Sequence, residues 1–265
     1  MGTRRRLDAL VALAAGTSRS RAQGLIMAGL VKVDGSVACK AGALVSEDAP
    51  LTIAEGQQYV GRGGKKLEFA LRQFEWWPTD LRCLDVGAST GGFTDCLLAH
   101  GARCVAALDV GYGQLAWKLR QDSRVAVIER TNFRYAVPAA IGAPFDLVVA
   151  DVSFISLSKV AANLAACLAP GGRAITLVKP QFEVGRSAVG RGGVVSKPGA
   201  HVEILSLVAS TLAACGLAPC RVTHSPLRGP AGNIEFFIGA VFGRPMPSGF
   251  DPTGVVRRAH EALRT

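Results

Sequence analysis

Five short apolar segments alternate with segments of helical character between residues 82 and 179. The apolar segments are RCLDVG, CVAALDVG, VAVIE, FDLVVADV and RAITLVK. Each is almost continuously apolar, which is typical of strands buried on both faces of a parallel sheet. The segments 92–100, 114–120, 157–168 and 201–215 favour helices. We therefore predict an α/β fold with a doubly wound, mostly parallel sheet.

Two later segments, RVTHSP and IEFFIGAVF, are predicted to close this sheet as an antiparallel edge pair, and the last residues form a loop and a short basic helix. Before the sheet, a small module contains predicted helices over residues 4–15 and 18–28. Short strands are expected around Val31–Val33 and Leu51–Ile53, with a turn at Asp34-Gly35. The predicted organisation is a first domain at 1–54, a linker at 55–63, a second domain at 64–245 and a basic tail at 246–265.

The net positive charge of the chain favours a negatively charged binding partner. Lys plus Arg total 30 against 20 Asp plus Glu, giving a net charge of +10, which suits a polyanion or an anionic membrane surface. The seven cysteines include no C-x-x-C pair, so we expect reduced thiols, no zinc site and no other metal. The N-terminal apolar run, Ala9 to Ala15, is too short and too closely flanked by charge for a signal peptide, and no stretch reaches the ~18 residues of a membrane span.

A glycine-rich turn follows the first predicted strand in LDVGASTGGFTDCLL. Its glycines allow a tight turn and close approach to a ligand, and Asp109 follows Gly87 by 22 residues at the end of the next strand. That spacing suits a carboxylate that holds a ribose hydroxyl. Asp85, just before the turn, is unfavourable for a pyrophosphate but favourable for S-adenosylmethionine, which carries a sulfonium and an ammonium. The pattern therefore favours a methyl donor over NAD.

The same turn also fits the G-x-S-x-G nucleophile elbow, with Ser89 as the nucleophile. Asp151 and His224 follow in the chain order of a hydrolase triad. However, the upstream oxyanion motif is missing, and the turn follows the first strand of the sheet. We keep this hydrolase as a rival interpretation.

Four charged residues occupy positions where solvation does not explain a charge. Asp151 and Lys179 end apolar strands, Glu235 lies inside another, and Lys66 lies in a helix before the sheet. In an open parallel sheet the carboxyl ends of the strands face the ligand crevice, so Asp151 and Lys179 should lie near Asp85. A lysine amine kept neutral by its surroundings can take the proton of a ribose hydroxyl during methyl transfer.

The motifs RGGKKLEFAL, LDVGASTGGFTDCLL, DLVVADVSFISL, LVKPQFEVGR and PLRGPAGNIEFF resemble, in order and spacing, the TlyA family of ribosomal RNA 2′-O-methyltransferases, often labelled haemolysin A. The second domain is similar to the FtsJ-type methyltransferases. The resemblance implies a Rossmann-like class I fold with a seven-stranded sheet, S-adenosyl-L-methionine as cofactor, and methylation of cytidine 2′-hydroxyls. The first domain resembles the small α+β RNA-binding domain named after ribosomal protein S-four.

The resemblance also implies residue roles. Lys179 would be the base of a Lys-Asp-Lys-Glu tetrad. The implied catalytic residues are Lys66, Asp151, Lys179 and Glu235; the implied cofactor residues are Asp85, Gly87, Ser89, Gly91, Phe93, Asp109, Glu129 and Asn132; and the implied RNA contacts are Arg4, Arg5, Arg6, Arg19, Arg21, Arg62 and Lys65.

The implied partners are ribosomal RNA and ribosomal subunits in the cytoplasm, with no membrane and no metal. Two further interpretations stay open. One is a non-catalytic RNA-binding or ribosome-assembly factor that uses the same surface. The other, suggested by the haemolysin label, is a membrane-lytic protein.

Overall fold

The structure is a computed structural model, and it describes residues 3–54, 59–184, 190–245 and 250–263. The chain divides into two compact units, Met1–Gln58 and Tyr59–Thr265. The domain boundaries expected from the sequence stay a prediction, because residues 55–58 and 246–249 lie outside the described part.

The N-terminal unit packs two helices against short strands. α1 (Leu7–Ala14) and α2 (Arg19–Met27) enclose a small apolar core with β2 (Val31–Val33). β2 lies between β3 (Ser36–Val37) and β5 (Leu51–Ile53) in an antiparallel sheet. Asp34 and Gly35 have φ values of 50° and 78°, as a two-residue hairpin turn requires. The predicted turn and strands are confirmed.

The predicted helix over residues 4–15 is wrong in its first turn. Arg4–Arg6 form a strand, β1, that pairs antiparallel with β4 (Leu44–Ser46), and α1 begins only at Leu7. The pairing gives the backbone of residues 4–6 hydrogen-bond partners from a distant segment, which local propensity does not anticipate.

The second unit contains a seven-stranded sheet in the order β11-β12-β10-β9-β6-β7-β8. All strands are parallel except β12, which is antiparallel to both of its neighbours, β10 and β11. The predicted doubly wound sheet with an antiparallel edge pair is confirmed. The strands are β6 (Arg82–Val86), β7 (Cys104–Leu108), β8 (Val125–Ile128), β9 (Phe145–Ala150), β10 (Leu168–Val178), β11 (Leu217–His224) and β12 (Phe236–Phe242).

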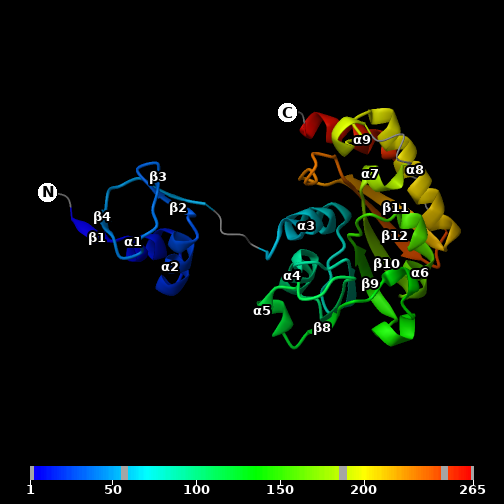
Figure 1. Cartoon of the computed structure of the whole chain (residues 1–265), viewed down its shortest axis with the longest axis horizontal. Coiled ribbons are helices and arrows are strands. Elements are labelled where there is room, and N and C mark those ends of the chain that lie inside the picture. The colour runs from blue at the N-terminus through cyan, green and yellow to red at the C-terminus, as the bar shows by residue number, and fades with distance from the viewer. Residues whose placement is uncertain (1–2, 55–58, 185–189, 246–249, 264–265) are drawn as a thin grey trace. The chain divides into compact units, whose positions relative to one another are not determined.

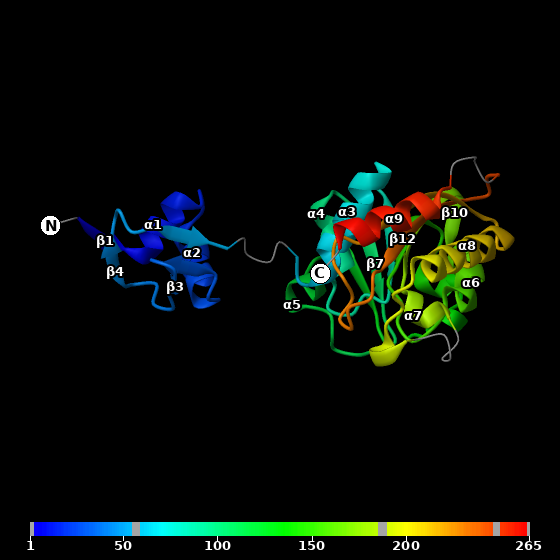
Figure 2. The ribbon, with the colours of Figure 1, turned by 90° about the horizontal axis from the view of Figure 1, so that it is seen from above.

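Helices cover both faces of this sheet (Figures 1 and 2). Successive residues of each strand point to opposite faces: Leu84 and Val86 pack in one apolar core, and Cys83 packs in the other. α3 (Arg62–Phe74), α4 (Gly92–Ala99) and α5 (Trp117–Arg120) contact the second of these cores or border it. α6 (Ala161–Ala166), α8 (Pro198–Ala214) and α9 (Pro252–Ala262) contribute to the first.

Two predicted helices are shorter than the sequence indicated. α5 starts at Trp117 instead of residue 114, and the segment 157–168 holds a 3₁₀ turn, Leu157–Lys159, and then α6. β10 already begins at Leu168, and its register with β9 shifts between Leu168 and Arg173. Pro170 and the two glycines after it interrupt the ladder at this point, since proline cannot donate a hydrogen bond.

Candidate active site

The glycine turn after β6 brings two strand ends into contact. Gly87 has a φ of +84°, and a Cβ at this position would lie 2.4 Å from the backbone oxygen of Asp151 at the end of β9. Only glycine is compatible with both this conformation and this approach. The N–H of Gly87 also donates to the carbonyl of Leu108, at 2.8 Å. The turn therefore gathers the carboxyl ends of β6, β7 and β9.

A cavity of about 580 Å³ opens beside this turn. Asp109 is held rigidly at its edge, because one carboxylate oxygen accepts from the N–H of Ser89 at 2.8 Å and the other from the N–H of Gly111 at 2.7 Å. Of the residues that the sequence assigned to a cofactor, four line this cavity: Gly87, Ser89, Asp109 and Asn132.

The other four residues of that set lie outside the lining. Gly91 packs against the leucines of the α5 region, Phe93 lines a smaller cleft of about 130 Å³, and Glu129 accepts from the N–H of Gly113 and pairs with Arg120. Asp85 is completely buried and accepts a hydrogen bond from Thr94 Oγ1 at 2.7 Å.

Burial raises the pKa of Asp85 to about 7, because the charged carboxylate loses its hydration. Its Oδ1 atom has no hydrogen-bond partner within the described ranges. Asp85 is fully buried and is not among the residues that line the larger cavity, so it offers no direct contact surface there.

The structure joins the four tetrad residues into two ion pairs. Lys66 Nζ lies 2.5 Å from Glu235 Oε2, and both side chains are almost fully buried. Lys179 Nζ lies 2.5 Å from Asp151 Oδ1 and also donates to Ser153 Oγ at 2.7 Å. The sequence indicated that these residues converge, but it did not indicate which lysine pairs with which carboxylate.

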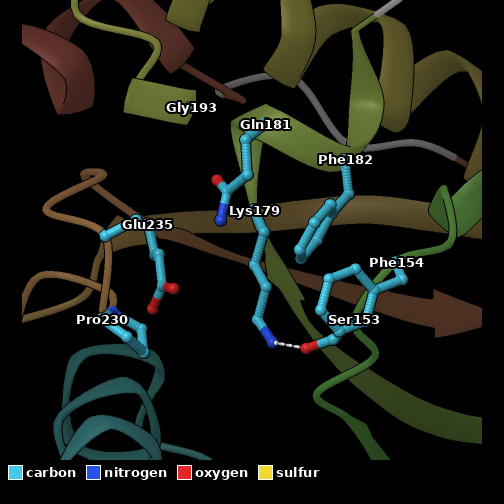
Figure 3. A pocket seen from close by; sticks show the side chains of 9 residues that line it. Ser153, Phe154, Lys179, Gln181, Phe182, Gly193, Pro230 and Glu235 are labelled. Carbon is cyan, nitrogen blue, oxygen red and sulfur yellow. Dashed lines mark hydrogen bonds between the residues drawn. The ribbon is translucent and has the colours of Figure 1, made fainter. Parts of the chain in front are cut away.

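A second cavity, of about 450 Å³, lies next to Lys179. Figure 3 shows Glu235 and Pro230 on one side of it, and Phe154 and Phe182 on the other. Ser153 and Phe154 line both this cavity and the larger one. The two cavities therefore adjoin at the segment that follows Asp151.

Sequence reasoning missed most of the lining of the second cavity. The signal was present, because Ser153 and Phe154 follow Asp151, and Gln181 and Phe182 follow Lys179, directly after strand ends where ligand contacts concentrate. The residues that were not anticipated are Ser153, Phe154, Gln181, Phe182, Gly193, Pro230 and Ala231.

The rival hydrolase triad is not assembled. The Ser89 hydroxyl lies against Gln114 Oε1, Asp151 pairs with Lys179, and the ring of His224 packs on Phe69 with a centroid distance of 5.6 Å. A hydrolytic triad requires its histidine to hydrogen-bond the serine, and no such bond occurs within the described residues.

The arginines of the N-terminal unit are partly organised by acidic residues. Asp8 is buried and binds Arg6 at 2.8 Å and Arg19 at 3.2 Å, and hydrogen bonds from Arg6 and Gln23 hold its pKa well below the usual range. Arg5 pairs with Glu47 at 3.0 Å. Arg4 and Arg21 are exposed, as are Arg62 and Lys65 at the start of α3 in the second unit.

Within the described ranges, none of the helices combines the length and the apolar character that a membrane-spanning segment needs. No group of three or more His, Cys, Asp or Glu side chains in these same ranges is arranged to hold a metal ion.

Comparisons with known proteins agree with both units. A model of the FtsJ-like methyltransferase family matches residues 59–242, and a model of the S4 domain matches residues 5–50. The chain is 48% identical over 241 residues to the 16S/23S rRNA (cytidine-2′-O)-methyltransferase TlyA of Mycobacterium tuberculosis, covering 90% of each chain.

A second curated relative is the putative rRNA methyltransferase YqxC of Bacillus subtilis, which is 44% identical over 269 residues, or 98% of this chain and 95% of the relative. Among solved structures, a putative hemolysin from Streptococcus thermophilus matches with a TM-score of 0.77 and 38% identity. That match covers 100% of this chain and 98% of the other.

Proposed function

The chain belongs to the TlyA family of FtsJ-like methyltransferases, and from this premise we propose that it methylates the ribose 2′-hydroxyl of a cytidine in ribosomal RNA with S-adenosyl-L-methionine as donor. The relatives named for this reaction support the substrate class. The observation that carries the proposal is the contact of two cavities at Ser153 and Phe154, with the Lys179–Asp151 ion pair beside them.

The larger cavity fits the methyl donor. Asp109 is held by two backbone N–H groups and keeps lone pairs for ribose hydroxyls. The backbone of Gly87 and Ser89, together with Asn132, offers further polar contacts along the lining. Asp85 is partly protonated near neutral pH, because its pKa is raised to about 7, and a cationic ligand bound nearby would favour its charged form. When bound, S-adenosyl-L-methionine supplies an electrophilic methyl group on a sulfonium sulfur.

The cavity of about 450 Å³ beside Lys179, called the acceptor cavity below, would bind the acceptor nucleotide. Lys179 lies on its lining, so its amine can receive the proton of the 2′-hydroxyl as the oxygen is methylated. The neutral amine carries out this step. Asp151 Oδ1 lies 2.5 Å from Nζ and Ser153 Oγ lies 2.7 Å from it, and these two contacts position the amine beside the cavity.

Lys66 and Glu235 support this arrangement from the other side of the cavity. Their buried pair connects α3 to the residue before β12, which fixes the wall on which Glu235 lies. Because positioning contributes much of the rate of an in-line transfer, a rigid wall is a catalytic requirement in this proposal.

The N-terminal unit would contact the phosphate backbone through Arg4, Arg5, Arg6, Arg19 and Arg21. Arg62 and Lys65 would make separate phosphate contacts from the second unit. The net charge of +10 supports a polyanionic partner. A ribosomal substrate implies that the enzyme works in the cytoplasm.

The test is incubation of the purified chain with tritiated S-adenosyl-L-methionine and with 30S or 50S subunits from a strain that lacks this gene, followed by mapping of the label with 2′-O-sensitive primer extension. Label at a cytidine 2′-oxygen is expected. Cofactor and subunit binding without label would favour the assembly-factor interpretation. Leakage of vesicles made of anionic lipid, with no label, would favour the membrane-lytic one.

A further inference from the structure

Several residues that line the cavity beside Lys179 have no role in the proposed methyl transfer. Lys179 and Glu235 belong to the tetrad, and Ser153 already accepts a hydrogen bond from Lys179. The remaining walls are apolar, apart from one uncharged polar side chain, that of Gln181. A cavity with apolar walls, one uncharged amide and the unpartnered Oε1 atom of Glu235 favours a ligand with an apolar face and hydrogen-bonding groups at its edge.

The shape of the walls agrees with such a ligand. The rings of Phe154 and Phe182 have centroids 5.1 Å apart and are tilted by 48°, and Pro230 lies across the cavity from them (Figure 3). The Phe154 side chain is 91% exposed although it is large and apolar. Its φ of +63° is rare for an aromatic residue, and such strained positions concentrate at ligand sites.

Gln181 carries an unsatisfied acceptor. Its Oε1 atom is buried and has no hydrogen-bond partner in the described part of the chain. A buried amide oxygen without a partner is costly, so a ligand that donates a hydrogen bond there recovers free energy. Figure 3 shows the amide extending into the cavity between Glu235 and Phe182.

The backbone fixes the position of Gln181 relative to Lys179. Gln181 lies two residues after Lys179, in the short helix α7 (Pro180–Glu183), and Phe182 N donates to the carbonyl of Lys179 at 2.9 Å. Glu183, at the end of α7, accepts from Ser156 Oγ at 2.7 Å and from Leu157 N at 3.0 Å. α7 is therefore tied to the segment that carries Ser153 and Phe154.

We infer that Gln181 selects the nucleobase of the target nucleotide. It would do so by hydrogen-bonding the Watson–Crick edge of a pyrimidine bound in this cavity. The inference rests on the proposed function, since it takes the substrate to be a cytidine in RNA. Cytosine presents an amino donor beside a ring-nitrogen acceptor, and the carboxamide of Gln181 presents an acceptor beside a donor. Uracil presents the reverse order, so any one orientation of the amide pairs with only one of the two bases.

The experiment uses the full chain and subunits in which the mapped target nucleotide is either the native cytidine or uridine. The measured quantity is kcat/KM for each, with the wild type, Gln181→Met and, as a matched control, Gln73→Met on the exposed surface of α3. We expect the wild type to prefer cytidine by about 10- to 100-fold, the range of one good base-edge pair. Gln181→Met should lose about this factor with cytidine and bring the preference close to one, while Gln73→Met keeps it.

Calorimetric binding of S-adenosyl-L-methionine shows whether each variant is folded. If Gln181→Met does not fold, Gln181→Asn withdraws the amide by one methylene and should reduce the preference in the same way. A wild type without preference, or a Gln181 variant that keeps the full preference, overturns the role of Gln181 and leaves the proposed reaction standing. A wild type that methylates no subunit while binding cofactor removes both proposals.

Discussion

Lys66 and Glu235 are 169 positions apart in the chain, and their side chains meet at 2.5 Å in the interior of the second unit. Glu235 is fully buried, and its second oxygen, Oε1, has no hydrogen-bond partner among the residues described. The wall of the acceptor cavity on which Glu235 lies therefore depends on a charge supplied by α3.

Removing the lysine of this pair should destabilise the protein strongly. Lys66→Met leaves Glu235 buried without a counter-ion, which costs about 3–5 kcal/mol. The double variant Lys66→Met/Glu235→Met removes both charges and should recover most of this loss while remaining inactive. Urea unfolding of the three proteins measures the effect, and equal destabilisation of the single and double variants would contradict it.

Lys179→Ala should abolish methylation and spare cofactor binding, because Lys179 lines the acceptor cavity and not the larger one. The control is Lys159→Ala, an exposed lysine in the 3₁₀ turn Leu157–Lys159. Turnover on subunits and calorimetry with S-adenosyl-L-methionine are compared for both. A Lys179→Ala enzyme with normal turnover would exclude Lys179 as the base.

Asp85 should make the protein less stable as the pH rises. Its folded pKa of about 7 lies above the usual value of 3.8 for an aspartate, so the folded state holds the proton more tightly, and this advantage disappears between about pH 4 and pH 7. Relative to Asp85→Asn, which does not titrate, the wild type should lose up to about 4 kcal/mol across this window and no more above it. Chemical unfolding at several pH values tests this, and a constant difference between the two proteins would disprove it.

His201 should act in the opposite sense. Burial, together with the neighbouring His260, lowers the pKa of His201 from 6.5 to about 4. The ring contacts Val195 O and His260 Nε2, each at 3.0 Å, and packs against Phe236. The stability contributed by the neutral ring is present above pH 6.5 and is lost as the pH falls toward 4. The melting temperature should therefore decrease more steeply between pH 7 and pH 4 for the wild type than for His201→Gln. Parallel curves of melting temperature against pH would argue against the prediction.

RNA affinity should fall steeply with salt, because phosphate contacts release counterions. The plot of log affinity against log salt has a negative slope, and Arg21→Ala should make that slope shallower by about one unit, since Arg21 is exposed on α2. Arg124→Ala is the control, because Arg124 lies in the second unit and outside the proposed set of RNA contacts. Filter binding to purified ribosomal RNA measures the slopes, and an affinity independent of salt would rule out this mode of binding.

The sheet was predictable because its signals are local. Near-continuous apolar strands, the glycine turn and the Asp34-Gly35 hairpin each depend on a few neighbouring residues, and the structure agrees with them. The strand Arg4–Arg6 was missed because its partner, Leu44–Ser46, lies forty residues away. The early end of α6 was missed for a similar reason, since β10 begins at Leu168 by pairing with β9.

The site was predictable in its residue types and less so in its contacts. Strand ends at Asp109, Asp151 and Lys179 indicated a crevice, because parallel strands finish at one edge of the sheet. The sequence did not indicate that Glu129 would pair with Arg120 instead of lining the larger cavity. It also did not indicate that Gln181 would line the cavity beside Lys179.

The alternation of strands and helices in the second unit, the glycine turn and the strand-end positions of Asp109, Asp151 and Lys179 could therefore be read from local periodicity and chain direction. Only the tertiary structure decided that Lys66 meets Glu235, that Lys179 meets Asp151 and that the two cavities adjoin at Ser153 and Phe154. These relations join segments far apart in the chain, and they depend on the packing of α3 and of the strand ends against one another, which no local pattern encodes.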